Sequence, residues 1–278
     1  MPDSDKYAVI GHPVAHSKSP VIHQLFAGQT GEQISYEAIE VAPEELQPAL
    51  TRFFALGGCG LNVTVPHKQA VIERMDSLTE RAEMAGAVNT ISRLEDGSLR
   101  GDNTDGIGLI IDLRDNLGID LESMHILVLG AGGAARGILA ALAELRPDEL
   151  VVANRTWQRA RDLAEELADI GRIKARAFDE LNVDEELDVP VFDLVINATS
   201  AGLEGTVAGF PPQIIGPETI CYDLSYSMND TPFVTWAREQ GCKASYQGWG
   251  MLVEQAAESF DIWRGVRPET AEVRAKLP

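Results

Sequence analysis

The chain has 278 residues, which at about 150 residues per domain suggests two domains. Hydrophobic residues make up 45% of the chain, so it is not a largely disordered protein. It has 43 acidic and 23 basic residues, and the net charge of −20 argues against nucleic acid as a partner, because phosphate backbones are bound by Lys and Arg. A local basic patch could still bind a small phosphorylated ligand.

We expect no membrane span, no exported segment and no metal site. The first five residues are acidic and lack the basic region and apolar run of a signal peptide. The most apolar window, residues 126–145, is interrupted by glycines and by Arg136, which is typical of a strand, a turn and a helix. The three cysteines, Cys59, Cys221 and Cys242, form an odd number without metal-ligand spacing. A cytoplasmic protein, monomeric or homodimeric, is expected.

Predicted strands and helices alternate along the chain, which favours an α/β fold with parallel sheets. In the first half, strands are predicted at residues 7–10, 34–41 and 61–65, and a hairpin at 88–100. A helix opens at Pro20 with Ser19 as its N-cap, and further helices cover residues 43–56 and 106–116.

The second half is more regular. Apolar runs of buried-strand length cover residues 126–129, 150–153, 192–197 and 220–224, and a short strand covers 244–246. Helices are predicted at residues 134–145, after the cap residue Thr156, after Thr231, and from about 250 to 264.

The segment from Gly130 to Ala135 has the sequence Gly-Ala-Gly-Gly-Ala-Ala and lies between a predicted strand and a predicted helix. Gly130 allows a tight turn, Gly132 lets the backbone approach a pyrophosphate, and Ala135 permits close packing of the helix. The helix N-terminus also offers free N–H groups to phosphate. A plain strand–helix turn would share this short pattern, but the order of strand, turn, helix and second strand favours a dinucleotide site.

The end of the next strand indicates which dinucleotide is bound. NAD-specific folds place an acidic residue there, whereas this chain continues with residues 154–159, Asn-Arg-Thr-Trp-Gln-Arg. Arg155 and Arg159 suit the 2′-phosphate of NADP through charge-assisted hydrogen bonds. Arg136 and Arg161 belong to the same local basic cluster, although Arg161 is more simply explained as part of a solvated helix face. We therefore expect NADP(H).

These signals predict a domain organisation with a cleft. We expect a substrate-binding catalytic domain at residues 1–104 and a Rossmann-type domain with a doubly wound parallel sheet at 105–247. The terminal helix, within 248–278, is expected to pack back on the first domain. The active-site cleft would lie between the two domains.

Polar residues near the predicted strand ends are candidates for the site. Asn62 and Thr64 share one face of their predicted strand, and Lys68 follows at its carboxyl end. Gln255 flanks the apolar stripe of the last predicted helix and needs a polar partner, such as a ligand hydroxyl. Tyr226 follows the 220–224 strand. By composition alone Lys68 would be a surface lysine.

Other candidates have equally plain structural explanations. Asp105 is also a reasonable helix cap, and Ser17 and Ser19 lie in a polar loop. None of these residues alone identifies a reaction.

Together the ordered segments resemble the shikimate dehydrogenase family along nearly the whole chain. The matching segments are IGHP at 10–13, HSKSP at 16–20, NVTVPHK at 62–68, GAVNT at 86–90, NTDG at 103–106, the glycine turn, NRT at 154–156, NATS at 197–200, YDLSY at 222–226 and GMLVEQA at 250–256. The resemblance implies NADPH-dependent, reversible reduction of 3-dehydroshikimate to shikimate, in the shikimate pathway that leads to chorismate and the aromatic amino acids.

The resemblance also implies roles for individual residues. Lys68 and Asp105 correspond to the catalytic pair of the family. The implied substrate-binding positions are Ser17, Ser19, Asn62, Thr64, Lys68, Asn89, Asp105, Tyr226 and Gln255. The implied cofactor positions are Gly130, Ala131, Gly132, Gly133, Ala134, Asn154, Arg155, Thr156, Arg159, Leu224, Gly248 and Glu80. Leu224 stands where many members have Met, but it remains apolar.

The chemistry of these side chains agrees with that implication. A polyhydroxylated acid needs many short polar partners, and Ser, Asn, Thr, Tyr and Gln supply donors and acceptors. A protonated Lys68 can give a proton to the oxygen of the reduced carbonyl, and the Asp105 carboxylate would favour the charged form of Lys68 and orient it.

Two alternatives remain. One is a quinate/shikimate dehydrogenase with broader substrate use or NAD preference, against which Ser17, Ser19 and the Asn154–Thr156 segment argue. The other is an NADPH-binding regulatory protein without catalysis, which would be expected to lack Lys68 or Asp105. Rates with quinate, shikimate and each cofactor distinguish them.

Overall fold

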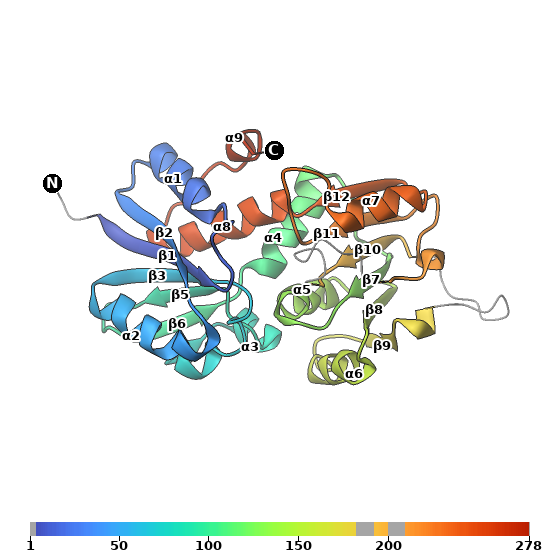
Figure 1. Cartoon of the computed structure of the whole chain (residues 1–278), viewed down its shortest axis with the longest axis horizontal. Helices are drawn as coiled ribbons and strands as arrows, with labels where there is room; N and C mark the ends of the chain where they lie inside the picture. Colours follow the sequence, from blue (N-terminus) through green and yellow to red (C-terminus); the bar gives the residue numbers. More distant parts are fainter. Residues whose placement is uncertain (1–3, 182–191, 200–208, 278) are drawn as a thin grey trace. The chain divides into compact units, whose positions relative to one another are not determined.

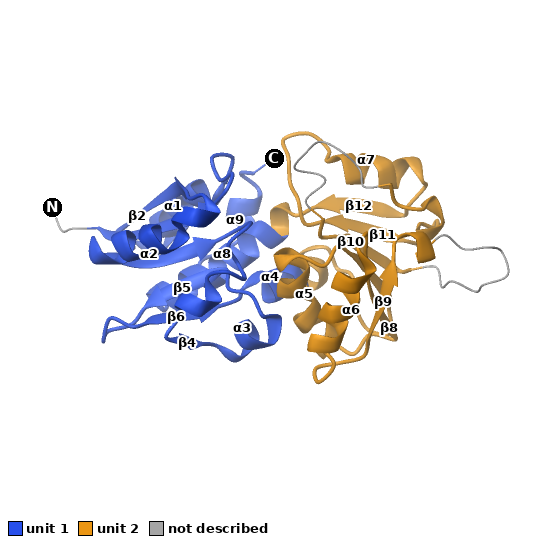
Figure 2. Cartoon of the chain, turned by 60° about the horizontal axis from the view of Figure 1, so that its bottom comes forward, with its two compact units in different colours: residues 1–111, 251–278 blue, residues 112–250 orange. Residues whose placement is uncertain are grey.

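The computed structural model describes residues 4–181, 192–199 and 209–277. The chain forms two compact units (Figures 1 and 2). Unit 1 comprises residues 1–111 and 251–278, and unit 2 comprises residues 112–250. Ser200, the last residue of the predicted 197–200 segment, lies outside the described residues. Within the described part of the chain, no helix is both long and apolar enough to cross a lipid bilayer.

Unit 1 is built on a mixed sheet with the strand order β2-β1-β3-β5-β6-β4. Its strands are β1 (Asp5–Gly11), β2 (Ile34–Glu40), β3 (Gly58–Val63), β4 (Ser77–Leu78), β5 (Thr90–Arg93) and β6 (Leu99–Asp102). Its helices are α1 (Ser19–Thr30), α2 (Leu46–Ala55), α3 (Glu80–Ala85), α4 (Asp105–Ile111), most of α8 (Trp249–Arg264) and α9 (Ala271–Arg274). The predicted hairpin is confirmed, because β5 and β6 are antiparallel and joined through Gly97, whose φ is +86°.

Two clusters of buried hydrophobic residues hold unit 1 together, and each cluster is formed by a different set of strands and helices. Residues of β1, β3 and α2, such as Ala8, Leu61 and Leu50, pack with the hairpin. Residues of α1 and α8, such as Phe26 and Phe260, form the other cluster with Val273 from α9. The prediction that the terminal helix packs on the first part of the chain is therefore confirmed, because residues of α8 pack against residues of α1.

Unit 2 has a six-stranded sheet in the order β12-β11-β10-β7-β8-β9, in which every pairing is parallel. Its strands are β7 (His125–Leu129), β8 (Glu149–Asn154), β9 (Ile173–Ala177), β10 (Leu194–Asn197), β11 (Ile220–Asp223) and β12 (Ala244–Gln247). Its helices include α5 (Gly133–Glu144), α6 (Trp157–Glu166) and α7 (Pro232–Glu239). Counted within the unit, the order is 3-2-1-4-5-6, the doubly wound arrangement of dinucleotide-binding folds. The predicted Rossmann-type sheet is confirmed.

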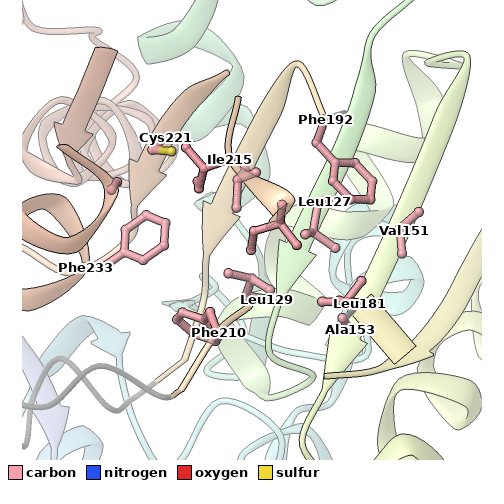
Figure 3. Packing of buried hydrophobic residues seen from close by; sticks show 13 residues of the cluster. Leu127, Leu129, Val151, Ala153, Leu181, Phe192, Phe210, Ile215, Cys221 and Phe233 are labelled. Carbon is pink, nitrogen blue, oxygen red and sulfur yellow. The ribbon is translucent and has the colours of Figure 1, made fainter. Parts of the chain in front are cut away.

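The four inner strands of this sheet, β11, β10, β7 and β8, are mostly apolar because both of their faces are buried. Leu127, Leu129 and Val151 point to one face, where they belong to one buried cluster with Phe192 and Phe233 (Figure 3). The alternate residues along the strands, including Ile126, Val128 and Ile196, are also fully buried. Burial of both faces explains why the sequence shows continuous apolar runs there instead of alternation.

Two local predictions in unit 1 were wrong, and a third is confirmed with a different first turn. Helix α1 begins at Ser19 with Lys18 in the N-cap position, so Ser19 is not its cap. Strand β3 ends at Val63, since the chain turns where the His67 N–H donates to the Thr64 carbonyl at 3.0 Å, and Val65 is left 41% exposed. The predicted helix at 43–56 is a short 3₁₀ turn, Pro43–Glu45, followed by α2.

In unit 2, strand β9 is an element that we did not predict. Ile173, Ala175 and Ala177 are half-buried while Lys174 and Arg176 are exposed, so a strict alternation marks it as an edge strand. Thr156 does occupy the N-cap position of α6, but its side chain makes no capping hydrogen bond.

Candidate active site

The Lys68 ammonium and the Asp105 carboxylate form a close ion pair in unit 1. Lys68 Nζ lies 2.6 Å from Asp105 Oδ2, and the side chains are only 12% and 6% exposed. Lys68 follows the turn after β3, and Asp105 is the first residue of α4. The Asp105 N–H donates to the Asn103 side chain at 3.1 Å, which holds the start of α4. The ammonium is therefore shielded from solvent and held in a fixed direction by the carboxylate.

Asn89 binds the other oxygen of this carboxylate. Its Nδ2 donates to Asp105 Oδ1 at 2.8 Å and to Thr104 Oγ1 at 2.9 Å. Its Oδ1 accepts from the Thr104 N–H at 2.9 Å and from the Thr90 hydroxyl at 2.8 Å. Since backbone N–H groups can only donate, the Asn89 amide has a single orientation, and Asp105 is held from two sides.

Asn62 is placed next to Asn89 by β3. Its Nδ2 lies 3.2 Å from the Asn89 carbonyl oxygen, 3.2 Å from Thr90 Oγ1 and 3.0 Å from Ser259 Oγ. Its Oδ1 accepts from the Tyr36 hydroxyl at 2.7 Å. Asn62 is 5% exposed, so its polar atoms are satisfied mainly by the protein.

Gln255 joins the same group from α8. Its Oε1 lies 3.4 Å from Asn89 Nδ2, and its Nε2 donates to the Leu252 carbonyl at 2.8 Å. Gly108 of α4 makes this possible, because a Cβ there would lie 2.8 Å from the Gln255 backbone nitrogen. Four predicted site residues of unit 1 thus converge with Lys68.

The remaining predicted residues of unit 1 are less closely linked. The Ser17 and Ser19 hydroxyls are hydrogen-bonded to each other at 3.2 Å. Thr64 is half-buried, and its backbone N–H donates to the Ile10 carbonyl at 2.9 Å. Glu80 is exposed in the first turn of α3, and among the residues described no hydrogen bond or ion pair joins it to the other candidates. Of the residues described, no group of three His, Cys, Asp or Glu side chains is arranged to hold a metal ion.

In unit 2 the glycine turn lies at the switch point of the sheet, between β7 and β10. Gly130 has φ of +108°, and a Cβ there would lie 3.0 Å from the backbone of Ala198. Gly132 is the N-cap of α5 and supplies no side-chain cap, while a Cβ on it would meet nothing within 4 Å. Open space above an uncapped helix N-terminus is what a pyrophosphate needs, so these residues fit a dinucleotide.

The end of β8 carries the predicted phosphate-binding residues. Asn154 donates to the Thr156 carbonyl at 2.9 Å and closes the turn before α6. Arg155 and Arg159 are exposed and have no ion pair among the residues described. The predicted cluster of four arginines is reduced to these two, because Arg136 is paired with Glu166 and Arg161 with Glu165.

Leu224 and Gly248 meet at the ends of β11 and β12. A Cβ on Gly248 would lie 2.5 Å from the Leu224 carbonyl oxygen, so only glycine fits this approach. Nearby Asp223 is fully buried and accepts hydrogen bonds from Asn197, Thr231 and the Ser225 N–H at 2.6–3.0 Å. Burial raises its pKa from 3.8 to about 6, and those donors offset part of the rise. The Tyr226 ring packs on Trp249, with centroids 4.5 Å apart.

Several residues of the site escaped the sequence analysis. Tyr36, Thr90, Thr104 and Ser259 all bind side chains of the predicted set. Thr90 follows Asn89 and Thr104 precedes Asp105, so their places in the sequence could have indicated that they belong to the site. Ser259 follows Gln255 by one helical turn, but nothing in the sequence near Tyr36 marks it.

Family models match three parts of the chain. They are the shikimate dehydrogenase substrate binding domain at residues 9–91, the shikimate/quinate 5-dehydrogenase family at 113–204, and the shikimate 5′-dehydrogenase C-terminal domain at 248–277.

Known proteins are similar over nearly the full length. The shikimate dehydrogenase (NADP(+)) of Alkalilimnicola ehrlichii is 52% identical over 274 residues, which cover 99% of this chain and 98% of the relative. An Ael1 enzyme from Pseudomonas putida has a TM-score of 0.87 at 43% identity, covering 99% and 98% of the two chains. Shikimate 5-dehydrogenase from Thermus thermophilus, in complex with NADP(H) and shikimate, has a TM-score of 0.83 at 35% identity, covering 98% and 97%. On this likeness the chain belongs to the shikimate dehydrogenase family.

Proposed function

We propose that the chain catalyses the reversible, NADPH-dependent reduction of 3-dehydroshikimate to shikimate, with Lys68 and Asp105 as the catalytic pair. It is then an NADP-dependent oxidoreductase acting on a CH–OH group, in the shikimate pathway of aromatic amino acid biosynthesis. The observation that carries the proposal is the shielded Lys68–Asp105 pair, 2.6 Å apart, with the predicted substrate residues Asn62, Asn89 and Gln255 linked to it.

The protein's part in the reaction is to supply a proton and to hold the substrate. Bound NADPH supplies the hydride, which is the chemistry of the cofactor. The Lys68 ammonium donates a proton to the carbonyl oxygen as that oxygen becomes a hydroxyl, and water then reprotonates the neutral amine. Asp105 keeps the ammonium oriented, and Asn89 keeps Asp105 in place. In the reverse direction, Lys68 accepts the proton.

We assign substrate binding to Ser17, Ser19, Thr64 and Tyr226 as well as to Asn62, Lys68, Asn89, Asp105 and Gln255. These side chains offer many short polar contacts, which suit the hydroxyls and the carboxylate of the substrate.

We assign NADP(H) binding to the glycine turn, to residues 154–156 with Arg159, and to Leu224, Gly248 and Glu80. The exposed Arg155 and Arg159 lie where the 2′-phosphate of NADP is bound in folds of this kind, and no acidic residue occupies residues 154–159. The turn from Gly130 to Ala134 would hold the pyrophosphate at the start of α5.

For the functional domains, we assign residues 1–104 and 248–278 to substrate binding and catalysis, and residues 105–247 to NADP(H). We further infer a cytoplasmic monomer or homodimer without a nucleic-acid partner. The odd number of cysteines, all free thiols, supports a reducing cytoplasm, and the net charge of −20 argues against a nucleic-acid partner.

The first experiment is a cofactor assay with the purified chain. Shikimate is supplied with NADP⁺ or NAD⁺, and formation of the reduced nicotinamide is followed by its absorbance, with quinate as the comparison substrate. We expect rapid NADPH formation from shikimate and little from quinate or with NAD⁺. Equal rates with both cofactors would contradict the 2′-phosphate assignment alone. No turnover with either cofactor would contradict the proposed function.

A further inference from the structure

A tyrosine on the edge strand of the unit 1 sheet is connected to the proposed substrate site. Tyr36 lies on β2, and Asn62 lies on β3, with β1 between these two strands. The Tyr36 side chain reaches across β1, and its hydroxyl donates to Asn62 Oδ1 at 2.7 Å. Tyr36 lies outside the short motif segments that resemble the family, and no role was expected for it.

The Tyr36 ring is held in place by other aromatic side chains. It stacks on His23 of α1, with centroids 4.2 Å apart and planes 7° apart, and it lies 6.5 Å from the Trp263 ring of α8. His23 is fully buried, and this burial lowers its pKa to about 3, so the imidazole facing Tyr36 is neutral. The position of the Tyr36 hydroxyl therefore follows from the packing of the ring.

The hydroxyl completes a set of bonds that gives the Asn62 amide one orientation. On the other side of the amide, Nδ2 lies 3.2 Å from the Asn89 carbonyl oxygen, which can only accept. A rotated amide would bring two acceptors, Asn62 Oδ1 and the Asn89 carbonyl, together at that distance. The Tyr36 donor stabilises the orientation that the Asn89 carbonyl requires.

We propose that Tyr36 is a positioning residue for the substrate: its hydroxyl orients the amide of Asn62, through which a ring hydroxyl of the polyhydroxylated acid is bound. The inference rests on the proposed function. Tyr36 acts through Asn62 and has no part in proton transfer, because the Lys68–Asp105 pair is held separately by Asn89 and Asn103.

The test compares Tyr36→Phe with the unchanged chain in the shikimate assay. The variant loses one hydroxyl and keeps the stacked ring. Loss of one hydrogen bond of ordinary strength predicts a KM for shikimate that rises about fivefold to tenfold. We expect kcat and the KM for NADP⁺ to stay within about twofold, because neither depends on Asn62 orientation.

Tyr7→Phe is the matched control. Tyr7 lies opposite Tyr36 in the register of β1 and β2, packs on Trp263, and has its hydroxyl 3.3 Å from Arg264 instead of a site residue. This variant should keep the KM for shikimate. If Tyr7→Phe raises that KM as much as Tyr36→Phe does, or if Tyr36→Phe leaves it unchanged, the inference is overturned.

A double-mutant cycle with Asn62→Ala separates positioning from general loosening. If Tyr36 acts through Asn62, Tyr36→Phe should have almost no effect once Asn62 is replaced by Ala. We expect the KM for shikimate to change less than about twofold in that background, which is about the scatter with which independent mutational effects add. An equal fold-change in both backgrounds would refute the coupling. If the unchanged chain does not turn over shikimate at all, the proposed function itself is contradicted. That result is distinct from a failure of the Tyr36 inference, which is judged only by the comparison of variants.

Discussion

The Asn89 amide donates to one oxygen of the Asp105 carboxylate at 2.8 Å, while Lys68 occupies the other oxygen at 2.6 Å. The carboxylate is thereby clamped between a neutral donor and a charged one. A free carboxylate would rotate and leave the ammonium without a fixed direction, whereas this arrangement keeps Lys68 Nζ in one place. Asn89 fixes the Asp105 carboxylate, and the carboxylate in turn fixes the Lys68 ammonium and its protons.

Replacement of Lys68 tests its role as the proton donor. Lys68→Ala should lower kcat for shikimate oxidation by about 10²- to 10⁴-fold, the usual contribution of general acid–base catalysis. The KM for shikimate should rise far less. Steady-state kinetics at saturating NADP⁺ measure both constants. A change in KM with kcat preserved would make Lys68 a binding residue only.

Replacement of Arg155 and Arg159 tests cofactor choice. Arg155→Ala or Arg159→Ala should raise the KM for NADP⁺ by roughly tenfold or more and leave the KM for NAD⁺ unchanged, because each removes a charge-assisted bond to the 2′-phosphate. Arg161→Ala is the control, since the Arg161 side chain is already bound to Glu165 at 2.6 Å. A similar loss in all three variants would mean that general surface charge is responsible.

Replacement of two glycines by alanine should affect different properties: Gly132→Ala should affect NADP⁺ binding, and Gly248→Ala should affect stability. A Cβ on Gly132 meets no protein atom within 4 Å, so Gly132→Ala should keep the thermal midpoint and weaken NADP⁺ binding by about tenfold or more. A Cβ on Gly248 would lie 2.5 Å from the Leu224 carbonyl oxygen, so Gly248→Ala should lower the thermal midpoint by several degrees. Thermal unfolding and NADP⁺ titration measure the two effects. A stable Gly248→Ala chain would show that the ends of β11 and β12 can separate.

The buried Asp223 should make stability depend on pH. Its pKa is raised to about 6 in the folded chain against 3.8 ordinarily, so the folded state holds this proton more tightly than the unfolded state. Stability from this group is therefore present below about pH 4, falls as pH rises between about 4 and 6, and is absent above that range, a total of about 3 kcal/mol.

Asp223→Asn isolates that contribution. Urea unfolding of both chains at several pH values between about 4 and 7 gives the difference in unfolding free energy, in which the other titrating groups cancel. We expect the stability of the unchanged chain relative to Asp223→Asn to decline as pH rises. A difference that is constant with pH would show that the Asp223 carboxyl titrates normally.

Much of unit 2 could be predicted because its signals are local. Runs such as 126–129 and 150–153 are buried on both faces, and Gly130 needs a backbone conformation that other residues rarely adopt, so each segment carries its own signature. Strand β9 was missed because an edge strand of five alternating residues resembles a polar loop. The end of β3 was misplaced because the alternation of residues 61–65 does not reveal the turn that the His67 N–H closes on the Thr64 carbonyl.

The sequence by itself determined the alternation of strands and helices, the glycine turn, and the residue types that suit a hydroxylated acid and NADP(H). Only the tertiary structure decided which side chains bind one another. Tyr36 reaches Asn62 across an intervening strand, Ser259 meets Asn62 from 197 residues away, and Arg136 is paired with Glu166 instead of remaining free. Periodicity and turn chemistry act over a few residues, whereas a hydrogen bond depends on where the packed sheet and helices bring its two partners.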